Sequence, residues 1–303
     1  MPNRPRPPQH VEIPARHRGR RAFAGAGALL ALTTALLAGG TAHAAPASAA
    51  AAVDRTTERS GADTRPPAAE PRDRTRVTAA VLDLDGPGRE PTVYGDDVTY
   101  DTASIIKVDI LATLLLRAQD AGRHLTAKER AHAEPMIRRS DNAAANALWR
   151  EIGRAPGLEA ANKRLGLTET RGGSGTRWGL TRTTASDQIR LLRAVFGTGG
   201  TSDAGTGGLN QESRTYVRTL MADVASEQAW GVSAAAGSGW ALKNGWLQRS
   251  TSGLWDVNSV GRIVVDGHRY LVAVLSDGST SMENGVALVE GAARAALTSA
   301  SGQ

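Results

Sequence analysis

Residues 104–119 read SIIKVDILATLLLRAQ, and apolar side chains fall on every side of a helix drawn through them. A helix that is apolar all round is buried in a protein, whereas a surface helix keeps one polar face. Ser104 and Lys107 are three residues apart, which places them on one helix face, one turn from each other. We therefore expect a buried helix that carries a hydroxyl and an amine together near its start.

Extended apolar segments lie near both ends of the folded region, and helical patterns lie between them. Strands are expected at residues 76–84, 91–94, 241–246, 254–260 and 270–275. Further helices are expected at residues 126–139 with an interruption at Pro135, 141–152, 157–164, 183–196, 210–224 and 284–297. This order favours an α+β fold in which an antiparallel sheet is built from both chain ends and a helical subdomain is inserted.

The first 75 residues do not have the pattern of a folded domain. Residues 1–44 combine six arginines with an apolar run and end in Ala42-His43-Ala44, which predicts a secretory signal peptide. Arg20-Arg21 resembles a twin-arginine export signal. A retained membrane helix is the alternative, but no stop-transfer pattern follows the run. Residues 45–75 have almost no large apolar side chain, which predicts a disordered linker before a domain at 76–299. We expect a secreted, extracellular protein without a stable membrane anchor.

Composition excludes several classes of function. The formal charge of +6 is concentrated in the leader, which holds six of the 36 basic residues and one of the 30 acidic ones, so a nucleic-acid partner is not expected. The chain has no cysteine, which excludes disulfides and thiolate chemistry. It also has neither a clustered His/Asp pattern nor a Gly-x-Ser-x-Gly motif. We expect no metal, no cofactor and no Ser-His-Asp triad.

Ser104 and Lys107 are a candidate pair for nucleophilic catalysis. A serine hydroxyl becomes a useful nucleophile when a neighbouring group takes its proton, and a lysine can do so when burial lowers its pKa. Lys107 lies among apolar residues, and Ser104 would stand at a helix N-terminus, where free backbone N–H groups favour developing negative charge. The spacing alone is weak, because such a pair also occurs by chance.

Two further motifs follow Ser-x-x-Lys in order. Ser140-Asp141-Asn142 precedes a helix, and Lys243-Asn244-Gly245 lies on a predicted strand. Taken singly, the first could be a helix cap and the second an edge-strand charge beside a bulge. Together with Ser104 and Lys107, the set resembles the signature of class A β-lactamases and penicillin-binding proteins. The resemblance extends over about residues 76–299.

The resemblance implies a role for each matched residue. Ser104 would form the acyl-enzyme, Lys107 would help to move its proton, and Ser140 would pass a proton to the leaving nitrogen. On the substrate side, Asn142 would hold the amide and Lys243 the carboxylate. The remaining substrate-binding positions would be Asn244, Gly245 and Trp246, with backbone N–H groups of Ser104 and Trp246 forming the oxyanion hole.

Three departures from the family pattern bear on the reaction. Asn244 stands where the family usually has Thr or Ser, which should alter carboxylate binding. Only 36 positions separate Ser104 from Ser140, fewer than in class A enzymes, so the site should be more open. No carboxylate occurs between Arg171 and Thr183, where class A enzymes carry the Glu that activates the deacylating water. Glu169 precedes this loop and is a weak substitute.

These observations predict a secreted active-site-serine acyl hydrolase, acylated on Ser104 by β-lactams or related carboxylate-bearing compounds. The alternatives are a D-Ala-D-Ala-type peptidase or esterase, and a penicillin-binding or cell-wall sensor protein that is acylated without turnover. The expected partner is a small β-lactam or a cell-wall peptide, and the expected state is a monomer.

Overall fold

The computed structural model describes residues 75–86, 90–197 and 207–301. The expected signal peptide and all but the last residue of the expected linker lie outside these ranges. The first strand begins at Arg76, where the sequence pattern also begins. No helix among the described residues is long and apolar enough to cross a membrane.

A five-stranded antiparallel sheet forms one part of the fold, with strand order β2-β1-β7-β6-β5. The strands are β1 (Arg76–Asp83), β2 (Thr92–Tyr94), β5 (Gly239–Gln248), β6 (Trp255–Val265) and β7 (His268–Ser279). Since β1 pairs with β7 from Arg76↔Asp277 to Asp83↔Tyr270, the two ends of the folded region share one sheet. The expected α+β architecture is confirmed.

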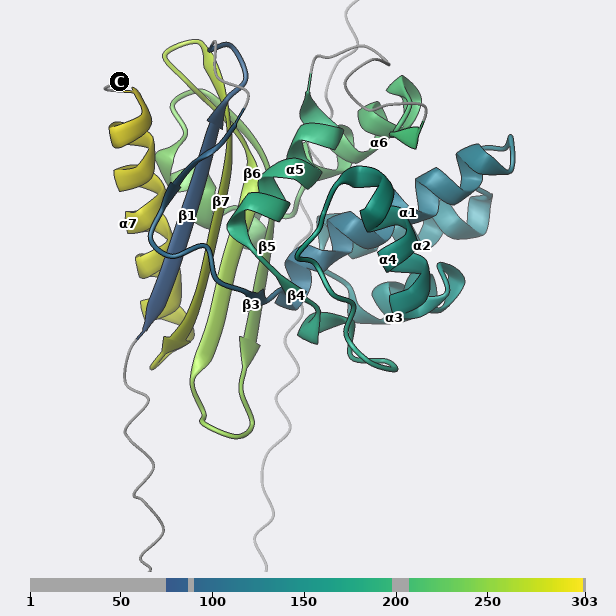
Figure 1. Cartoon of the computed structure of the whole chain (residues 1–303), viewed down its shortest axis with the longest axis horizontal. Helices are drawn as coiled ribbons and strands as arrows, with labels where there is room; N and C mark the ends of the chain where they lie inside the picture. The colour runs from purple at the N-terminus through teal and green to yellow at the C-terminus, as the bar shows by residue number, and fades with distance from the viewer. Residues whose placement is uncertain (1–74, 87–89, 198–206, 302–303) are drawn as a thin grey trace, which may run out of the picture. The chain divides into compact units, whose positions relative to one another are not determined.

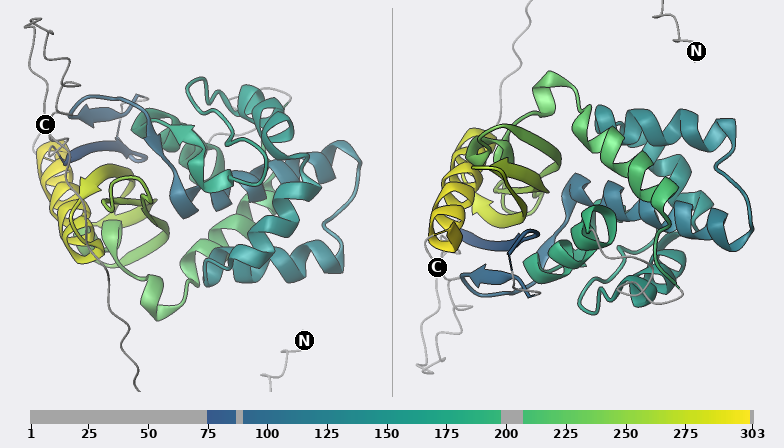
Figure 2. Two further views of the ribbon diagram at one scale, coloured as in Figure 1. Left: turned by 90° about the horizontal axis from the view of Figure 1, so that it is seen from below. Right: turned by 90° about the horizontal axis from the view of Figure 1, so that it is seen from above.

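Helices cover both faces of this sheet (Figures 1 and 2). Helix α7 (Met282–Ser301) packs on one face against β1, β6 and β7, over an apolar cluster that includes Val272 and Val289. Helix α5 (Ala185–Phe196) contacts β1, β6 and β7 and belongs, with Leu271 and Leu275, to the second and larger apolar cluster. The sheet is therefore buried on both sides, as its continuous apolar strands require.

The helical subdomain is built around α1 (Ile106–Asp120), in which only Arg117, Gln119 and Asp120 are not buried. Its neighbours are α2 (Ala127–Arg138), α3 (Asn142–Glu151), α4 (Arg154–Leu165) and α6 (Gln211–Ala222), and each of them contacts α1. The expectation of a buried helix is confirmed. A helix that is apolar on every side is stable in water only when other elements surround it.

Short elements connect the sheet to the helices. They are the paired strands β3 (Tyr100–Asp101) and β4 (Arg182–Thr183) and the 3₁₀ turns η1 (Ala103–Ile105), η2 (Trp178–Leu180), η4 (Ser226–Gln228) and η5 (Gly231–Ala235). Ser104 therefore lies in a 3₁₀ turn directly before α1, next to the helix N-terminus where the sequence pattern placed it.

Element bounds differ from the sequence pattern at several ends. Pro135 does not interrupt α2, which runs from Ala127 to Arg138. Proline removes one backbone hydrogen bond, but the helix is held by burial of Met136 and Ile137 and by a capping box of Thr126 and Glu129. Helix α4 begins three residues before its expected start, and β6 and β7 extend beyond theirs.

Candidate active site

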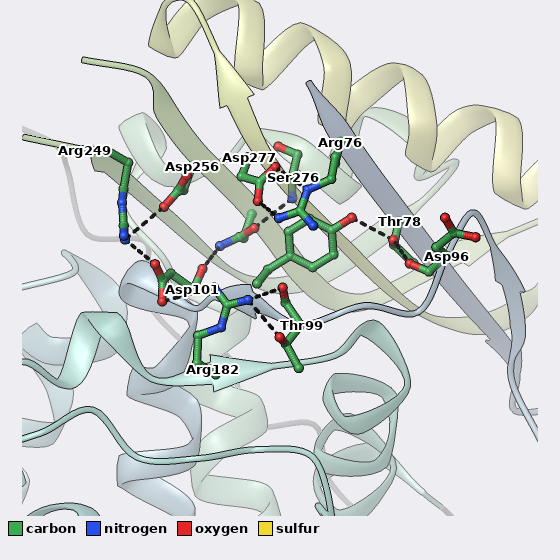
Figure 3. A network of polar contacts seen from close by, with 12 residues as sticks. Arg76, Thr78, Asp96, Thr99, Asp101, Arg182, Arg249, Asp256, Ser276 and Asp277 are labelled. Carbon is green, nitrogen blue, oxygen red and sulfur yellow. Dashed lines mark hydrogen bonds and ion pairs between the residues drawn. The ribbon is translucent and has the colours of Figure 1, made fainter. Parts of the chain in front are cut away.

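The chain segment that leads into Ser104 is fixed by a polar network between the sheet and β4 (Figure 3). The Asp101 carboxylate is 8% exposed and forms ion pairs with Arg249 and, at 3.5 Å, with Arg182. The side-chain amide of Asn258 donates to the backbone oxygens of Asp101 at 2.9 Å and Thr102 at 3.2 Å. Ion pairs of Asp101 and buried hydrogen bonds from the Asn258 side chain thus hold residues 101–102 in place just before the candidate nucleophile.

Ser104 sits at a tight backbone junction with β5. Ala103, directly before it, has φ of 46°, a left-handed conformation that costs free energy for a residue with a Cβ. A Cβ built on Gly245 would lie 2.6 Å from the backbone nitrogen of Ser104 and 2.8 Å from that of Ile105. Only glycine therefore lets β5 approach η1 this closely. β5 is one of the two edge strands of the sheet, so its outward backbone groups pair with no further strand among the described residues.

Lys107 is fully buried at the start of α1, and its amine has three hydrogen-bond acceptors. Its Nζ lies 2.6 Å from the Ser140 carbonyl oxygen, 3.1 Å from Ser140 Oγ and 2.7 Å from Asn142 Oδ1. Burial lowers the pKa of Lys107 to about 7, and the negative charge of Asp141 opposes this shift. A substantial fraction of the amine is therefore neutral near pH 7 and able to accept a proton.

Ser140 and Lys243 complete the polar centre. The Lys243 amine donates to Ser140 Oγ at 3.0 Å and to the Asn244 carbonyl oxygen at 2.7 Å. Its pKa is well below the usual range, first because it is buried and second because Lys107 is positively charged nearby. Asp141 plays a different part, since its carboxylate accepts from the Ala144 N–H at 2.7 Å and caps α3. Ser140 Oγ thus lies between two lysine amines from different parts of the chain.

Asn244 lies on β5, as the sequence pattern predicts, but its side chain points away from Lys243. Its side chain is buried; the amide nitrogen donates to the carbonyl oxygens of Gln228 and Trp230 at 2.8 and 2.9 Å, and Oδ1 accepts from Ser259 Oγ at 2.6 Å. Side chains alternate along a strand, so the Asn244 side chain leaves β5 on the face opposite to Lys243. The geometry therefore does not support a substrate contact by the Asn244 side chain; it anchors β5 to the segment around η4 and η5.

Trp246 follows Gly245 on β5 and pairs with Val257 of β6. Its side chain is half-buried, and its ring centroid lies 5.9 Å from that of Trp230. The indole thus packs against the connection before β5, and any part in the chemistry falls to the Trp246 backbone.

Trp178 is a site residue that the sequence analysis missed. It lies in η2, within the loop between Arg171 and Thr183, and the Lys107 Nζ atom stands 4.8 Å from its ring centroid. The indole N–H donates to Asn146 Oδ1 on α3 at 2.8 Å. A lone tryptophan in a glycine-rich loop was the only sequence signal available, and it does not reveal which side chain the ring will contact.

The described residues offer no carboxylate in this loop and no group of three His, Cys, Asp or Glu side chains arranged for a metal ion. Glu169, which precedes the loop, has an exposed side chain, and its backbone N–H donates to Asp187 Oδ2 on α5 at 2.8 Å. The structure thus brings Lys107, Ser140, Asn142 and Lys243 together, and Gly245, two residues after Lys243, lies against the backbone of Ser104; no carboxylate of the loop between Arg171 and Thr183 joins them.

Comparisons with known proteins identify the family and the fold. A family model described as the β-lactamase enzyme family matches residues 115–300, a range that includes Ser140 and Lys243 and begins after Ser104 and Lys107. No curated protein sequence matches.

Several solved structures are similar at low sequence identity. A PBP-A variant, described as an acyl-enzyme complex with penicillin G, is 20% identical, with a TM-score of 0.61 over 77% of this chain and 92% of that one. A β-lactamase from Sphaerobacter thermophilus is 21% identical, with a TM-score of 0.60 over 75% and 92%. A β-lactamase from Xanthomonas campestris is 20% identical, with a TM-score of 0.58 over 73% and 90%. These likenesses show a shared fold.

Proposed function

Because the chain belongs to the β-lactamase enzyme family, we propose that it is an active-site-serine acyl hydrolase acylated on Ser104 by β-lactams or related carboxylate-bearing compounds. One observation carries the proposal: Ser140 Oγ lies 3.1 Å from the Lys107 amine and 3.0 Å from the Lys243 amine. Three motifs far apart in sequence therefore meet at one hydroxyl, and Gly245 of the third motif lies against the backbone of Ser104.

In the proposed acylation step, neutral Lys107 takes the proton of the Ser104 hydroxyl while Ser104 Oγ forms a bond to the substrate carbonyl carbon. The bond from that carbon to nitrogen then breaks. The proton passes from Lys107 to Ser140 Oγ, and the Ser140 proton passes to the leaving nitrogen, which balances the step. A pKa of about 7 suits Lys107 to this exchange, because the amine can both accept and release a proton near neutral pH.

Substrate binding is proposed to rest on charge and on backbone donors. Lys243 would attract the carboxylate of the substrate. The side-chain oxygen of Asn142 accepts from Lys107, so the Asn142 side-chain nitrogen would be the atom that binds the amide group of the substrate. Backbone N–H groups of Ser104 and Trp246 would bind the oxyanion, since Gly245 allows β5 to lie against η1. A bound carboxylate would also raise the pKa of Lys243 and favour its charged form.

The loop between Arg171 and Thr183 favours a second candidate, a penicillin-binding protein whose acyl-enzyme persists. No described residue there supplies a carboxylate to activate water. A peptidase or esterase acting on cell-wall-like peptides or small esters uses the same acylation step and remains the alternative substrate class. The basic, apolar leader supports the proposal that the protein acts outside the cytoplasm, where such substrates are found.

Intact-mass spectrometry of the mature protein, mixed with a chromogenic β-lactam while colour is followed, tests the proposal. An adduct on Ser104 that clears over many turnovers supports a β-lactamase, and an adduct that persists supports a penicillin-binding role. The Ser104→Ala variant should give no adduct. If the wild-type protein gives neither adduct nor colour, a D-Ala-D-Ala peptide and a small ester become the substrates to assay.

A further inference from the structure

Trp178 occupies the side of the candidate site where the loop between Arg171 and Thr183 meets Lys107. We propose that the Trp178 side chain shields acylated Ser104 from water and so prolongs the lifetime of the acyl-enzyme. The inference rests on the proposed acylation of Ser104, and it assigns to this loop a role in limiting hydrolysis.

The loop is joined directly to the backbone that carries Ser104. Turn η2 contacts η1, and a Cβ on Gly179 would lie 3.8 Å from the Cα of Ala103. The backbone N–H of Thr102 donates to the carbonyl oxygen of Thr181 at 2.9 Å. Trp178 is thus held on a turn that packs against the residues immediately before the nucleophile, and a shift of η2 would also move the start of η1.

Hydrogen bonds from two tryptophans fix the loop to α3. The Trp178 indole donates to Asn146 Oδ1 at 2.8 Å, and the Trp149 indole donates to the carbonyl oxygen of Gly175 at 2.8 Å. Inside the loop, the Gly173 N–H donates to Thr181 Oγ1 at 3.0 Å. The Trp178 indole is therefore hydrogen-bonded to α3 while the face of its ring lies over Lys107.

An indole in this position disfavours hydrolysis for two reasons. Hydrolysis of an acyl-enzyme needs a water molecule near the ester carbon and a base to take its proton. The apolar face of the Trp178 ring, 4.8 Å from Lys107 Nζ, offers water no strong hydrogen-bond acceptor. The same ring lies over Lys107 Nζ, the nearest amine that could take a proton from water, and so restricts the approach of water to that group.

The test separates formation of the adduct from its decay. Wild-type protein, Trp178→Ala, Trp178→Phe and Asn146→Ala are acylated with penicillin G and, in parallel, with p-nitrophenyl acetate, and the mass of each adduct is followed after removal of free reagent. We expect adducts to form within threefold of the wild-type rate in Trp178→Phe and Asn146→Ala, and the decay of each adduct after removal of reagent is read independently of how fast it formed. Decay should be at least tenfold faster in Trp178→Ala, within threefold of wild type in Trp178→Phe, and intermediate in Asn146→Ala, in which the ring is released from α3.

Trp240→Ala is the matched control, because it removes a half-buried indole of β5 that packs in the apolar cluster beneath α7. Its adduct should decay at the wild-type rate. Equal decay in wild type, Trp178→Ala and Asn146→Ala would overturn the inference and leave the proposed function standing. If neither reagent labels Ser104 in the wild-type protein, the proposed function fails and the inference fails with it. Should Trp178→Ala not fold, Asn146→Ala and Trp178→Phe still decide the question.

Discussion

The two sides of the candidate site differ in construction. On one side, called here the acylation side, Ser104, Lys107, Ser140 and Lys243 are placed by η1, α1, the start of α3 and β5, and both lysines are buried. The other side, called here the loop side, consists of residues 171–181; it places an indole beside Lys107 and contains no carboxylate. Under the proposed function, formation and hydrolysis of the acyl-enzyme would rest on separate parts of this fold, so that one part could change while the other is kept.

The largest effect is expected on the acylation side. Lys107→Ala removes the group that takes the Ser104 proton, so acylation by penicillin G should slow by about 10²- to 10⁴-fold. The rate of adduct formation, followed by intact mass, measures this. Lys128→Ala, which changes an exposed lysine of α2, should acylate at the wild-type rate. Unchanged acylation in Lys107→Ala would remove Lys107 from the mechanism.

A carboxylate added to the loop side should speed hydrolysis of the acyl-enzyme. Trp178→Glu and Trp178→Gln both remove the indole, but only the first adds a base, so the acyl-enzyme of the Glu variant should decay about 10²-fold faster than that of the Gln variant. Decay of the two adducts after removal of penicillin G gives the ratio. Equal decay would show that position 178 cannot deliver a base to the ester.

Asn244 tests whether β5 tolerates the family's usual residue. Asn244→Thr cannot reproduce two donated and one accepted hydrogen bond in a buried position, so the free energy of unfolding should fall by roughly 1 to 3 kcal/mol. Urea unfolding measures this, with Gln248→Thr, an exposed position on the same strand, as the control. Tighter β-lactam binding without a loss of stability would mean that the hydroxyl reaches the substrate and that the anchoring role is wrong.

The smallest effect concerns pH. Because the neutral amine of Lys107 is the active form, the acylation rate should rise with pH through a midpoint near 7. The charge of Asp141 raises the pKa of Lys107, so Asp141→Asn should move this midpoint to lower pH while asparagine keeps the α3 cap. Acylation rates between pH 5 and 9 show both. A midpoint that moves upward would contradict the assignment of the proton acceptor.

The sequence predicted the acylation side better than the loop side. Ser104, Lys107, Ser140 and Lys243 belong to motifs with fixed spacing, and elements of the right type carry them to one place. The buried character of α1 was also readable, because apolar residues surround that helix on every side.

Features that depend on tertiary contacts were not predictable. Strand alternation predicts that Asn244 points away from Lys243, but no local pattern reveals its hydrogen-bond partners Gln228, Trp230 and Ser259. The same is true of Trp178, whose ring position depends on Asn146 of α3. The predicted interruption at Pro135 was wrong, because burial of the neighbouring side chains outweighs the loss of one backbone hydrogen bond.

The pairing of β1 with β7 has a consequence for the time course of folding. Arg76 and Asp277 lie 201 residues apart in sequence, yet their side chains form an ion pair across neighbouring strands. Contacts between such distant segments close late, and chains dominated by them fold slowly. The pairing of β1 with β7 can therefore form only when residues 268–279 are present, so an incomplete chain that lacks them leaves that edge of β1 without its partner strand. The last strand of the sheet is thus needed before its first strand can be enclosed.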